Sequence, residues 1–198
     1  MSEAVSVDLI ARIREIARSL CTPERYEHII GVERLAVELS RLYSENTLSA
    51  SLCAIAHDIY RDTEVGELLR MANRYHLEVS DVELKRPVLL HGKVAALYMK
   101  HEYGIEGDVF EAIYWHVSGR TNLPLVGKIL MVADMGEESR FFPGANEVRK
   151  IAITDLEKSF LNVLRLKMSW SIESRQAILP ETVLAWNDCI GGVRYVSD

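Results

Sequence analysis

The chain has 198 residues, of which 48% are hydrophobic and 26% are charged, with 23 Lys and Arg against 29 Asp and Glu. This composition is that of a folded globular protein and excludes collagen-like, intrinsically disordered and disulfide-rich chains. The formal net charge of −6, without any run of Lys or Arg, argues against a nucleic-acid partner and against binding to an anionic membrane surface.

Three further features of the sequence bear on the compartment in which the protein works. The longest apolar runs, such as 52–56 and 129–133, are far shorter than the ~20 residues that a membrane-spanning helix needs. The first residues, MSEAVSVDL, lack the basic and apolar regions of a secretory signal. Cys21, Cys53 and Cys189 are far apart and are expected to be reduced thiols. We therefore expect a cytoplasmic protein without a membrane partner.

From its beginning to its end, the chain repeats hydrophobic residues at three- and four-residue steps, which is the period of an amphipathic helix. The pattern predicts helices over 9–20, 23–43, 48–59, 65–76, 89–103, 109–117, 124–138 and 146–170, and a last short helix after Pro180. The range 146–170 is expected to be one long amphipathic helix. Because no segment alternates as a strand does and no linker interrupts the chain, we expect a single all-α domain over residues 1–198.

The residues that could carry chemistry are histidines and aspartates, because the phosphate-binding loops and nucleophile elbows of other enzymes are absent from the sequence. His57 and Asp58 follow the apolar segment SLCAIA, where an ionised Asp is rare unless it is paired or metal-bound. His28 and Asp134 each lie in register with the apolar residues of their own helix. Three helices thus point a nitrogen or oxygen ligand inward, as in the metal sites of helix bundles. Imidazole and carboxylate ligands together suit Fe, Mn, Co or Zn.

Each of these residues also has an ordinary structural explanation. A single histidine on an apolar face is more often a core residue than a ligand, and an inward Asp can simply pair with an Arg. The coincidence of three such positions favours a shared metal site. His91 and His116 could be loop histidines without a role, and His76 and His101 are expected at the surface.

Three arginines lie close in sequence to the candidate ligands. Arg25 and Arg61 are each three residues from one of them, and Arg140 is six residues from another. Any one of them could form a surface ion pair. Together they suggest a clamp for phosphate groups, which Arg binds through two parallel hydrogen bonds.

An ordered set of motifs carries a family resemblance. These motifs are R-Y-E-H (25–28), H-D-I-Y-R (57–61), L-L-H-G (89–92), W-H-V-S-G-R (115–120), A-D-M-G-E-E-S-R-F-F-P-G (133–144) and E-V-R-K-I-A (147–152). From about residue 25 to 156 the chain resembles the HD-domain phosphohydrolases of the YqeK type, the symmetrical diadenosine-tetraphosphate hydrolases of bacteria. The resemblance implies an HD-domain helical bundle that cleaves diadenosine tetraphosphate to two ADP with a metal-activated water.

The resemblance also implies a role for particular residues. The implied metal ligands are His28, His57, Asp58 and Asp134, with iron as the expected metal and Mn or Co as alternatives. The implied catalytic residues are His57, Asp58 and Arg61. The implied substrate-binding residues are Arg25, Asp58, His91, His116, Val117, Arg140, Ala177, Ile178, Leu179, Pro180, Glu181 and Thr182.

The chain departs from the family pattern at four positions. Arg61, Val117, Gly136 and Glu138 stand where the family usually has Lys, Thr, Ile and Pro. Two other functions therefore stay open, an HD-domain nucleotidase acting on another nucleotide and a non-catalytic nucleotide-binding module. The resemblance also allows a homodimer, although no heptad or exposed apolar stripe in the sequence requires one.

Overall fold

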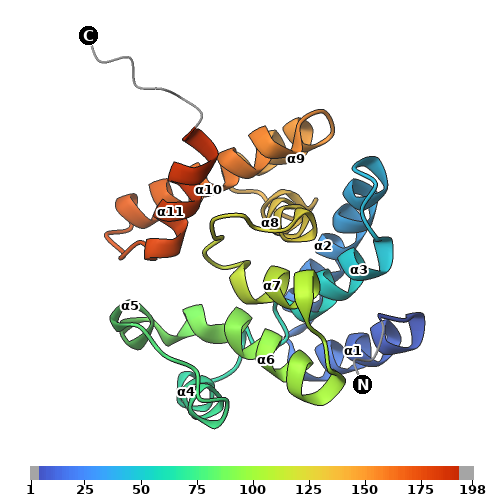
Figure 1. Ribbon diagram of the computed structural model, residues 1–198, viewed down its shortest axis with the longest axis vertical. Helices are drawn as coiled ribbons and strands as arrows, with labels where there is room; N and C mark the ends of the chain where they lie inside the picture. Colours follow the sequence, from blue (N-terminus) through green and yellow to red (C-terminus); the bar gives the residue numbers. More distant parts are fainter. Residues whose placement is uncertain (1–4, 192–198) are drawn as a thin grey trace.

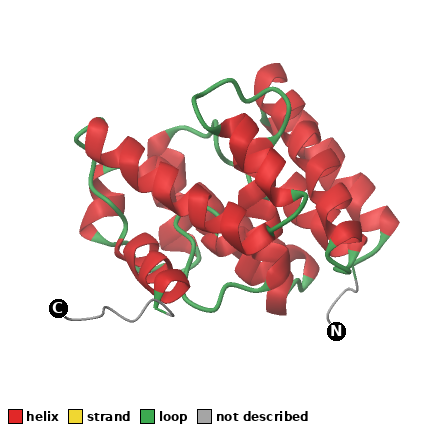
Figure 2. Ribbon diagram, turned by 90° about the horizontal axis from the view of Figure 1, so that it is seen from above, coloured by secondary structure: helices red, strands yellow, loops and turns green. Residues whose placement is uncertain are grey.

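Helices make up all the regular secondary structure of residues 5–191, which are the residues that the computed structural model describes (Figure 2). In chain order they are α1 (Val7–Leu20), α2 (Pro23–Leu42), α3 (Thr47–Ala56), α4 (Val65–Arg74), α5 (Asp81–Lys85), the 3₁₀ helix η1 (Pro87–Leu90), α6 (His91–Tyr103), α7 (Gly107–Trp115), α8 (Leu125–Gly136), α9 (Ala145–Ala152), α10 (Leu156–Glu173) and α11 (Pro180–Ile190). The expected all-α fold class is confirmed.

Side chains at the helix ends explain where several helices begin. Ser6, Thr22 and Asn46 each accept a hydrogen bond from a backbone N–H in the first turn of the helix that follows. Pro23 occupies the first position of α2, where its missing N–H costs no hydrogen bond. These caps fix the starts of α1, α2 and α3 near the positions that the sequence predicts.

The prediction of one helix over 146–170 is wrong. The chain forms two helices there, α9 and α10, which pack against each other and against α8. The break falls at 153–155, where the side chain of Asp155 accepts the backbone N–H of Lys158 and begins α10. Apolar residues continue at helical spacing on both sides of this cap, so the period alone could not show the break.

Two shorter differences also matter for the site. The helix predicted over 48–59 ends at Ala56, which leaves His57 as its C-cap residue. The hydrophobic period does not predict α5, whose first turn is a capping box between Ser80 and Glu83. The first difference concerns the end of an element and the second a helix of only five residues, and in both cases capping contacts, not the hydrophobic period, decide the structure.

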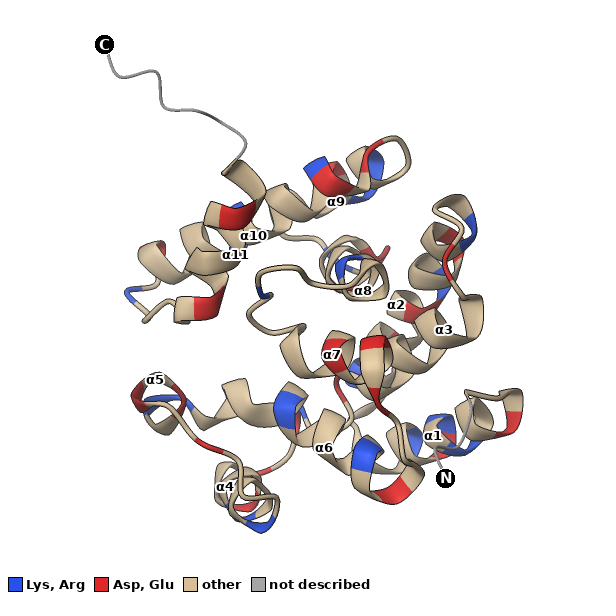
Figure 3. Ribbon diagram, in the orientation of Figure 1, with Lys and Arg blue, Asp and Glu red and all other residues tan. Residues whose placement is uncertain are grey.

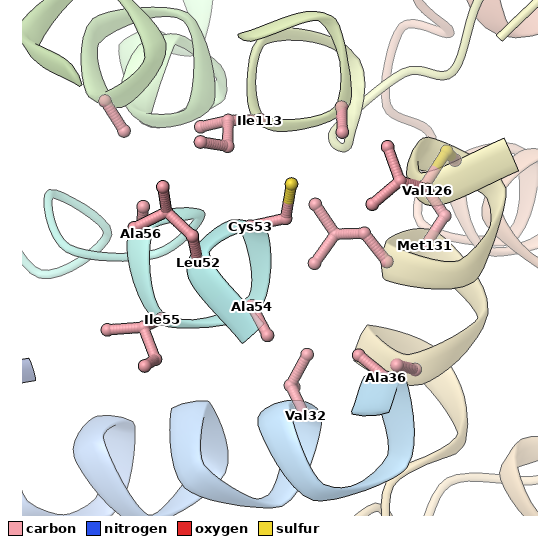
Figure 4. Packing of buried hydrophobic residues seen from close by; sticks show 14 of the residues in the cluster. Val32, Ala36, Leu52, Cys53, Ala54, Ile55, Ala56, Ile113, Val126 and Met131 are labelled. Atoms are coloured by element: carbon pink, nitrogen blue, oxygen red, sulfur yellow. The ribbon is translucent and has the colours of Figure 1, made fainter. Parts of the chain in front are cut away.

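The core is built around α3, which lies between α2 and the pair α7 and α8 (Figures 1 and 4). This helix carries no charged residue and is tan throughout in Figure 3. All of its residues from Ala50 to Ala56 are buried. Figure 4 shows its side chains among Val32 and Ala36 of α2, Ile113 of α7, and Val126 and Met131 of α8. Because α3 ends inside the molecule, the polar residues that follow it are also placed there.

The described part of the chain also bears on the membrane and cysteine expectations. Among residues 5–191, none of the helices combines the length and the hydropathy that crossing a bilayer requires. Cys21, Cys53 and Cys189 are free thiols, and burial raises the pKa of Cys21 to about 12. Cys21 therefore remains protonated at neutral pH, and burial likewise raises the pKa of the other two thiols.

Candidate active site

Six polar side chains from separate helix ends and helix faces meet beside the end of α3. They are His28 of α2, His57 and Asp58 directly after α3, His91 at the start of α6, His116 at the end of α7, and Asp134 of α8. All six are buried. Titratable groups are rarely buried together unless they pair with one another or bind a metal.

Asp58 lies at the centre of this cluster, and its two carboxylate oxygens face different partners. Its Oδ2 is 3.9 Å from Nε2 of His28 and 3.6 Å from Nε2 of His57. Its Oδ1 is 2.9 Å from Nε2 of His91 and 3.7 Å from Nε2 of His116. Asp58 therefore joins two pairs of imidazoles into one site.

Three of the histidines are oriented by the same local contact. His57, His91 and His116 each stand at a helix boundary. Each donates a hydrogen bond from Nδ1 to the backbone carbonyl three residues earlier. The distances are 2.6 Å for His57, 2.6 Å for His91 and 2.8 Å for His116. This contact fixes the tautomer and turns Nε2 toward Asp58. Nε2 of His57 is buried and has no hydrogen-bond partner among the described residues, so its lone pair is free to bind a metal.

His28 is held differently, by a carboxylate that the sequence analysis missed. Its Nδ1 donates to Oε1 of Glu137 at 3.0 Å, and its Nε2 lies 3.1 Å from Oδ1 of Asp134. Glu137 is only 2% exposed and also accepts hydrogen bonds from the backbone and side chain of Ser139. A carboxylate behind an imidazole orients the ring and raises its basicity as a metal ligand. The only sequence signal for Glu137 is its place three residues after Asp134.

Two glycines allow these side chains to approach the helices closely. A Cβ at Gly31 of α2 would lie 2.5 Å from Oε2 of Glu137, and a Cβ at Gly92 of α6 would lie 2.5 Å from Cε1 of His116. Real Cβ atoms are not found at such distances, so any larger residue at either position would displace a side chain of the site. Both positions lie in helices, where Gly is otherwise unfavourable.

The electrostatic environment sets the charge of the cluster. Burial alone would raise the pKa of Asp58, but the surrounding imidazoles hold that pKa well below its usual range. Burial also opposes the ionised form of Asp134, yet His28 and Arg140 hold its pKa well below the usual range. Burial lowers the pKa of His57 to about 4. At neutral pH, Asp58 and Asp134 are therefore ionised and His57 is neutral. These are the protonation states in which carboxylates and imidazoles bind a metal.

The donor set fits a divalent metal ion. Ligand atoms of His28, His57 and Asp58 lie within 4.8 Å of one another. Oδ1 of Asp134 lies 3.1 Å from Nε2 of His28 and 3.9 Å from Nε2 of His57. Asp58, His91 and His116 form a second group with the same spread. The free lone pair of His57 and the carboxylate behind His28 are features expected of a metal centre.

A cavity of about 200 Å³ opens onto the cluster. Its lining residues are Arg25, Asp58, Arg61, Arg86, Val88, Leu89, His91, His116, Val117, Asp134, Arg140 and Lys167. Five cationic side chains thus face two carboxylates, which leaves an excess of three positive charges. This excess suits a ligand with several negative charges.

The cations of the cavity fall into two groups. Arg25 donates to Asp58 Oδ2 and Arg140 to Asp134 Oδ1, both at 2.7 Å. By contrast, the other three cations of the cavity have no carboxylate of residues 5–191 within ion-pair distance. They are Arg61, Arg86 and Lys167. Arg61 is predicted from the sequence, whereas Arg86 and Lys167 are not, because they come from parts of the chain distant from the candidate ligands.

The structure does not bring all the expected substrate residues to this cavity. The stretch 177–182 lies between α10 and α11 and in the first turn of α11, and none of its residues lines the cavity. Thr182 is buried, whereas Ala177 and Pro180 are exposed. Val117 does line the cavity, and His76 and His101 are exposed, as the sequence predicts.

Comparison with known proteins gives consistent matches. Residues 25–135 match the HD domain. The chain is 34% identical over 177 residues to the symmetrical bis(5'-nucleosyl)-tetraphosphatase of Halalkalibacterium halodurans, covering 89% of this chain and 94% of the relative. It is 32% identical over 172 residues to the protein of that name from Bacillus subtilis, covering 86% and 92%. A crystal structure from Clostridium acetobutylicum, described as a predicted HD superfamily hydrolase involved in NAD metabolism, superposes with a TM-score of 0.87 at 29% identity, covering 92% of this chain and 97% of the other.

Proposed function

This chain belongs to the HD-domain family and, within it, to the symmetrical bis(5'-nucleosyl)-tetraphosphatases, and from this premise we propose that it hydrolyses diadenosine tetraphosphate to two ADP. One observation carries the proposal. A buried His and Asp cluster suited to a metal ion opens into the same cavity as an excess of three cations. A chain of linked phosphates needs both, a metal at the bond that breaks and cations for the remaining charge.

The residues proposed to hold the metal are His28, His57, Asp58 and Asp134. A bound divalent ion supplies a Lewis acid, which lowers the pKa of coordinated water and polarises a phosphoryl oxygen. We propose iron as the metal because the family resemblance implies it, and Mn and Co stay alternatives because imidazole and carboxylate ligands suit all three.

The protein's own side chains position the water and balance the charge of the phosphates. Asp58 is ionised at neutral pH and can accept a hydrogen bond from the attacking water. His91, His116 and Arg61 face the cavity and neutralise charge that develops on the phosphate chain. Attack at the centre of the chain breaks the bond between the bridging oxygen and one phosphorus. The water oxygen joins that phosphorus, its protons pass to solvent, and each half leaves as ADP.

The remaining substrate contacts are part of the same proposal. Arg25 and Arg140 are proposed to shift from their carboxylate partners toward the nucleotide when metal is bound. Val117 offers no hydroxyl to the substrate, and its carbonyl instead accepts a hydrogen bond from Lys167 at 3.1 Å. The roles of residues 177–182, a homodimer and a cytoplasmic location stay predictions.

The proposal is tested by product analysis of metal-loaded protein incubated with diadenosine tetraphosphate. We expect two ADP per substrate, and loss of turnover in Asp58→Asn but not in the control Asp108→Asn, whose side chain is exposed on α7. ATP and AMP as products would reject symmetrical cleavage. Turnover of other nucleotides alone would indicate a different HD-domain nucleotidase, and bound metal without any turnover would indicate a binding module.

A further inference from the structure

One side of the cavity, formed by η1 and α10, is not used by the proposed chemistry. Arg86, at the start of η1, and Lys167, on α10, line the cavity there. The ammonium of Lys167 donates to the carbonyl oxygens of His116 and Val117 at 3.4 and 3.1 Å, and no carboxylate of the described residues pairs with it. Burial lowers the pKa of Lys167, so the ammonium is poorly solvated and favours an anionic ligand.

An aromatic side chain continues this side of the cavity outward. Trp170 follows Lys167 by three residues on α10, which places both on one helix face. The guanidinium carbon of Arg86 lies 4.8 Å from the centroid of the indole ring. Trp170 is nevertheless 50% exposed, so much of its ring surface remains open to a ligand. Arg86 therefore belongs both to the cavity and to a stacked pair at its edge.

The size of the cavity limits which part of the substrate it can hold. A volume of about 200 Å³ is below the roughly 300–1,000 Å³ of sites that enclose a drug-sized ligand. It can hold the phosphates beside the metal cluster but not two nucleosides. At least one nucleoside must therefore lie outside the cavity, and an exposed indole beside a guanidinium is a surface on which nucleobases stack.

We propose that Lys167, Arg86 and Trp170 form a subsite for the second nucleotide of the substrate, which is the half that extends away from the metal cluster along α10. In this subsite Lys167 contacts the phosphates, and the Arg86–Trp170 pair stacks with the base. The inference rests on the proposed function, since it requires a substrate with a nucleoside at both ends.

The test compares two ligands that differ only in the second nucleoside, diadenosine tetraphosphate and adenosine 5'-tetraphosphate. KM is measured for the first, and the inhibition constant is measured for the second as a competitor. In Trp170→Ala we expect the KM of the dinucleoside to rise about 5- to 150-fold, which corresponds to the loss of one stacked base, with kcat nearly unchanged. The inhibition constant of adenosine 5'-tetraphosphate should stay at the wild-type value. The control Ile172→Ala removes a 66% exposed apolar side chain from the same helix and should alter neither constant.

Lys167→Met supplies the second arm, because a phosphate contact serves both ligands and its loss should weaken both of them. Trp170→Ala values equal to wild type, or an equal loss for the two ligands, would overturn the assignment of the second nucleoside. An unchanged Lys167→Met variant would overturn the phosphate contact. Wild-type protein that does not cleave the dinucleoside at all would instead contradict the proposed function, so the two failures are distinguishable.

Discussion

The two ends of the cavity carry similar residue types but pair them differently. Arg25 and Arg140 each contact a carboxylate of the cluster at 2.7 Å, and together with the four ligand candidates they are called the paired end. The unpaired end is Arg61, Arg86 and Lys167, which have no carboxylate partner among residues 5–191. In the proposed function, the paired end holds the metal ion and the unpaired end attracts the polyanion.

The largest effect short of removing a ligand is expected where a helix backbone touches the site. In Gly92→Ala the new Cβ would lie 2.5 Å from the ring of His116, which must then move away from Asp58. We expect kcat/KM to fall about 100-fold, because small displacements at a reaction centre are costly. Gly66→Ala is the matched control, since its Cβ would meet only the end of the flexible Arg70 side chain at 3.6 Å. Equal activity of the two variants would contradict the role proposed for the close contact between Gly92 and His116.

A change behind the metal ligands should affect the metal and not the substrate. Glu137→Gln keeps the size of the side chain but removes the charge that accepts the Nδ1–H of His28 at 3.0 Å. We expect metal affinity to fall about 10- to 100-fold, as for other carboxylates behind metal-bound histidines. Metal titration would show this, with KM unchanged at saturating metal. The neighbouring Glu138→Gln is the control, because Glu138 is exposed, and a loss of affinity in both variants would exclude a specific role for Glu137.

A change at the unpaired end should affect the substrate and not the metal. Its effect should be the smallest of the three predicted effects. Arg61→Gln removes one unpaired cation from the cavity wall. We expect kcat/KM for diadenosine tetraphosphate to fall about tenfold, which is the loss of one charged hydrogen bond, with metal affinity unchanged. The fall should shrink as the salt concentration increases, because salt screens the lost attraction. A changed metal affinity would show that the two ends do not act separately.

The sequence predicted the paired end better than the unpaired end, for a physical reason. His28 and Asp134 interrupt an apolar helical face, and His57 and Asp58 follow the most apolar segment, so the hydrophobic pattern alone indicates that all four are buried. These four ligand candidates do meet in one buried cluster, although their roles stay proposals. Glu137 could not be told from the acidic residue beside it by sequence, because only the contact with His28 separates the two.

Two members of the unpaired end, Arg86 and Lys167, come from segments that are distant in sequence from the ligand candidates. Lys167 lies on α10, more than a hundred residues from Asp58, and nothing in its local sequence separates it from a surface lysine. The same limit applies to the division between α9 and α10, where α9 ends at Ala152 and the Asp155 cap begins a second helix. Local periodicity describes which face of a helix is buried, but it does not describe which helices meet.

The most direct test of the division between the two ends is a crystal structure of the protein loaded with Mn²⁺ and the product ADP, with anomalous data for the metal. We expect an anomalous peak within ligand distance of His28, His57, Asp58 and Asp134. We also expect phosphate oxygens in contact with Arg61 or Lys167. A peak elsewhere in the molecule, or ADP phosphates bound away from those two cations, would contradict this division.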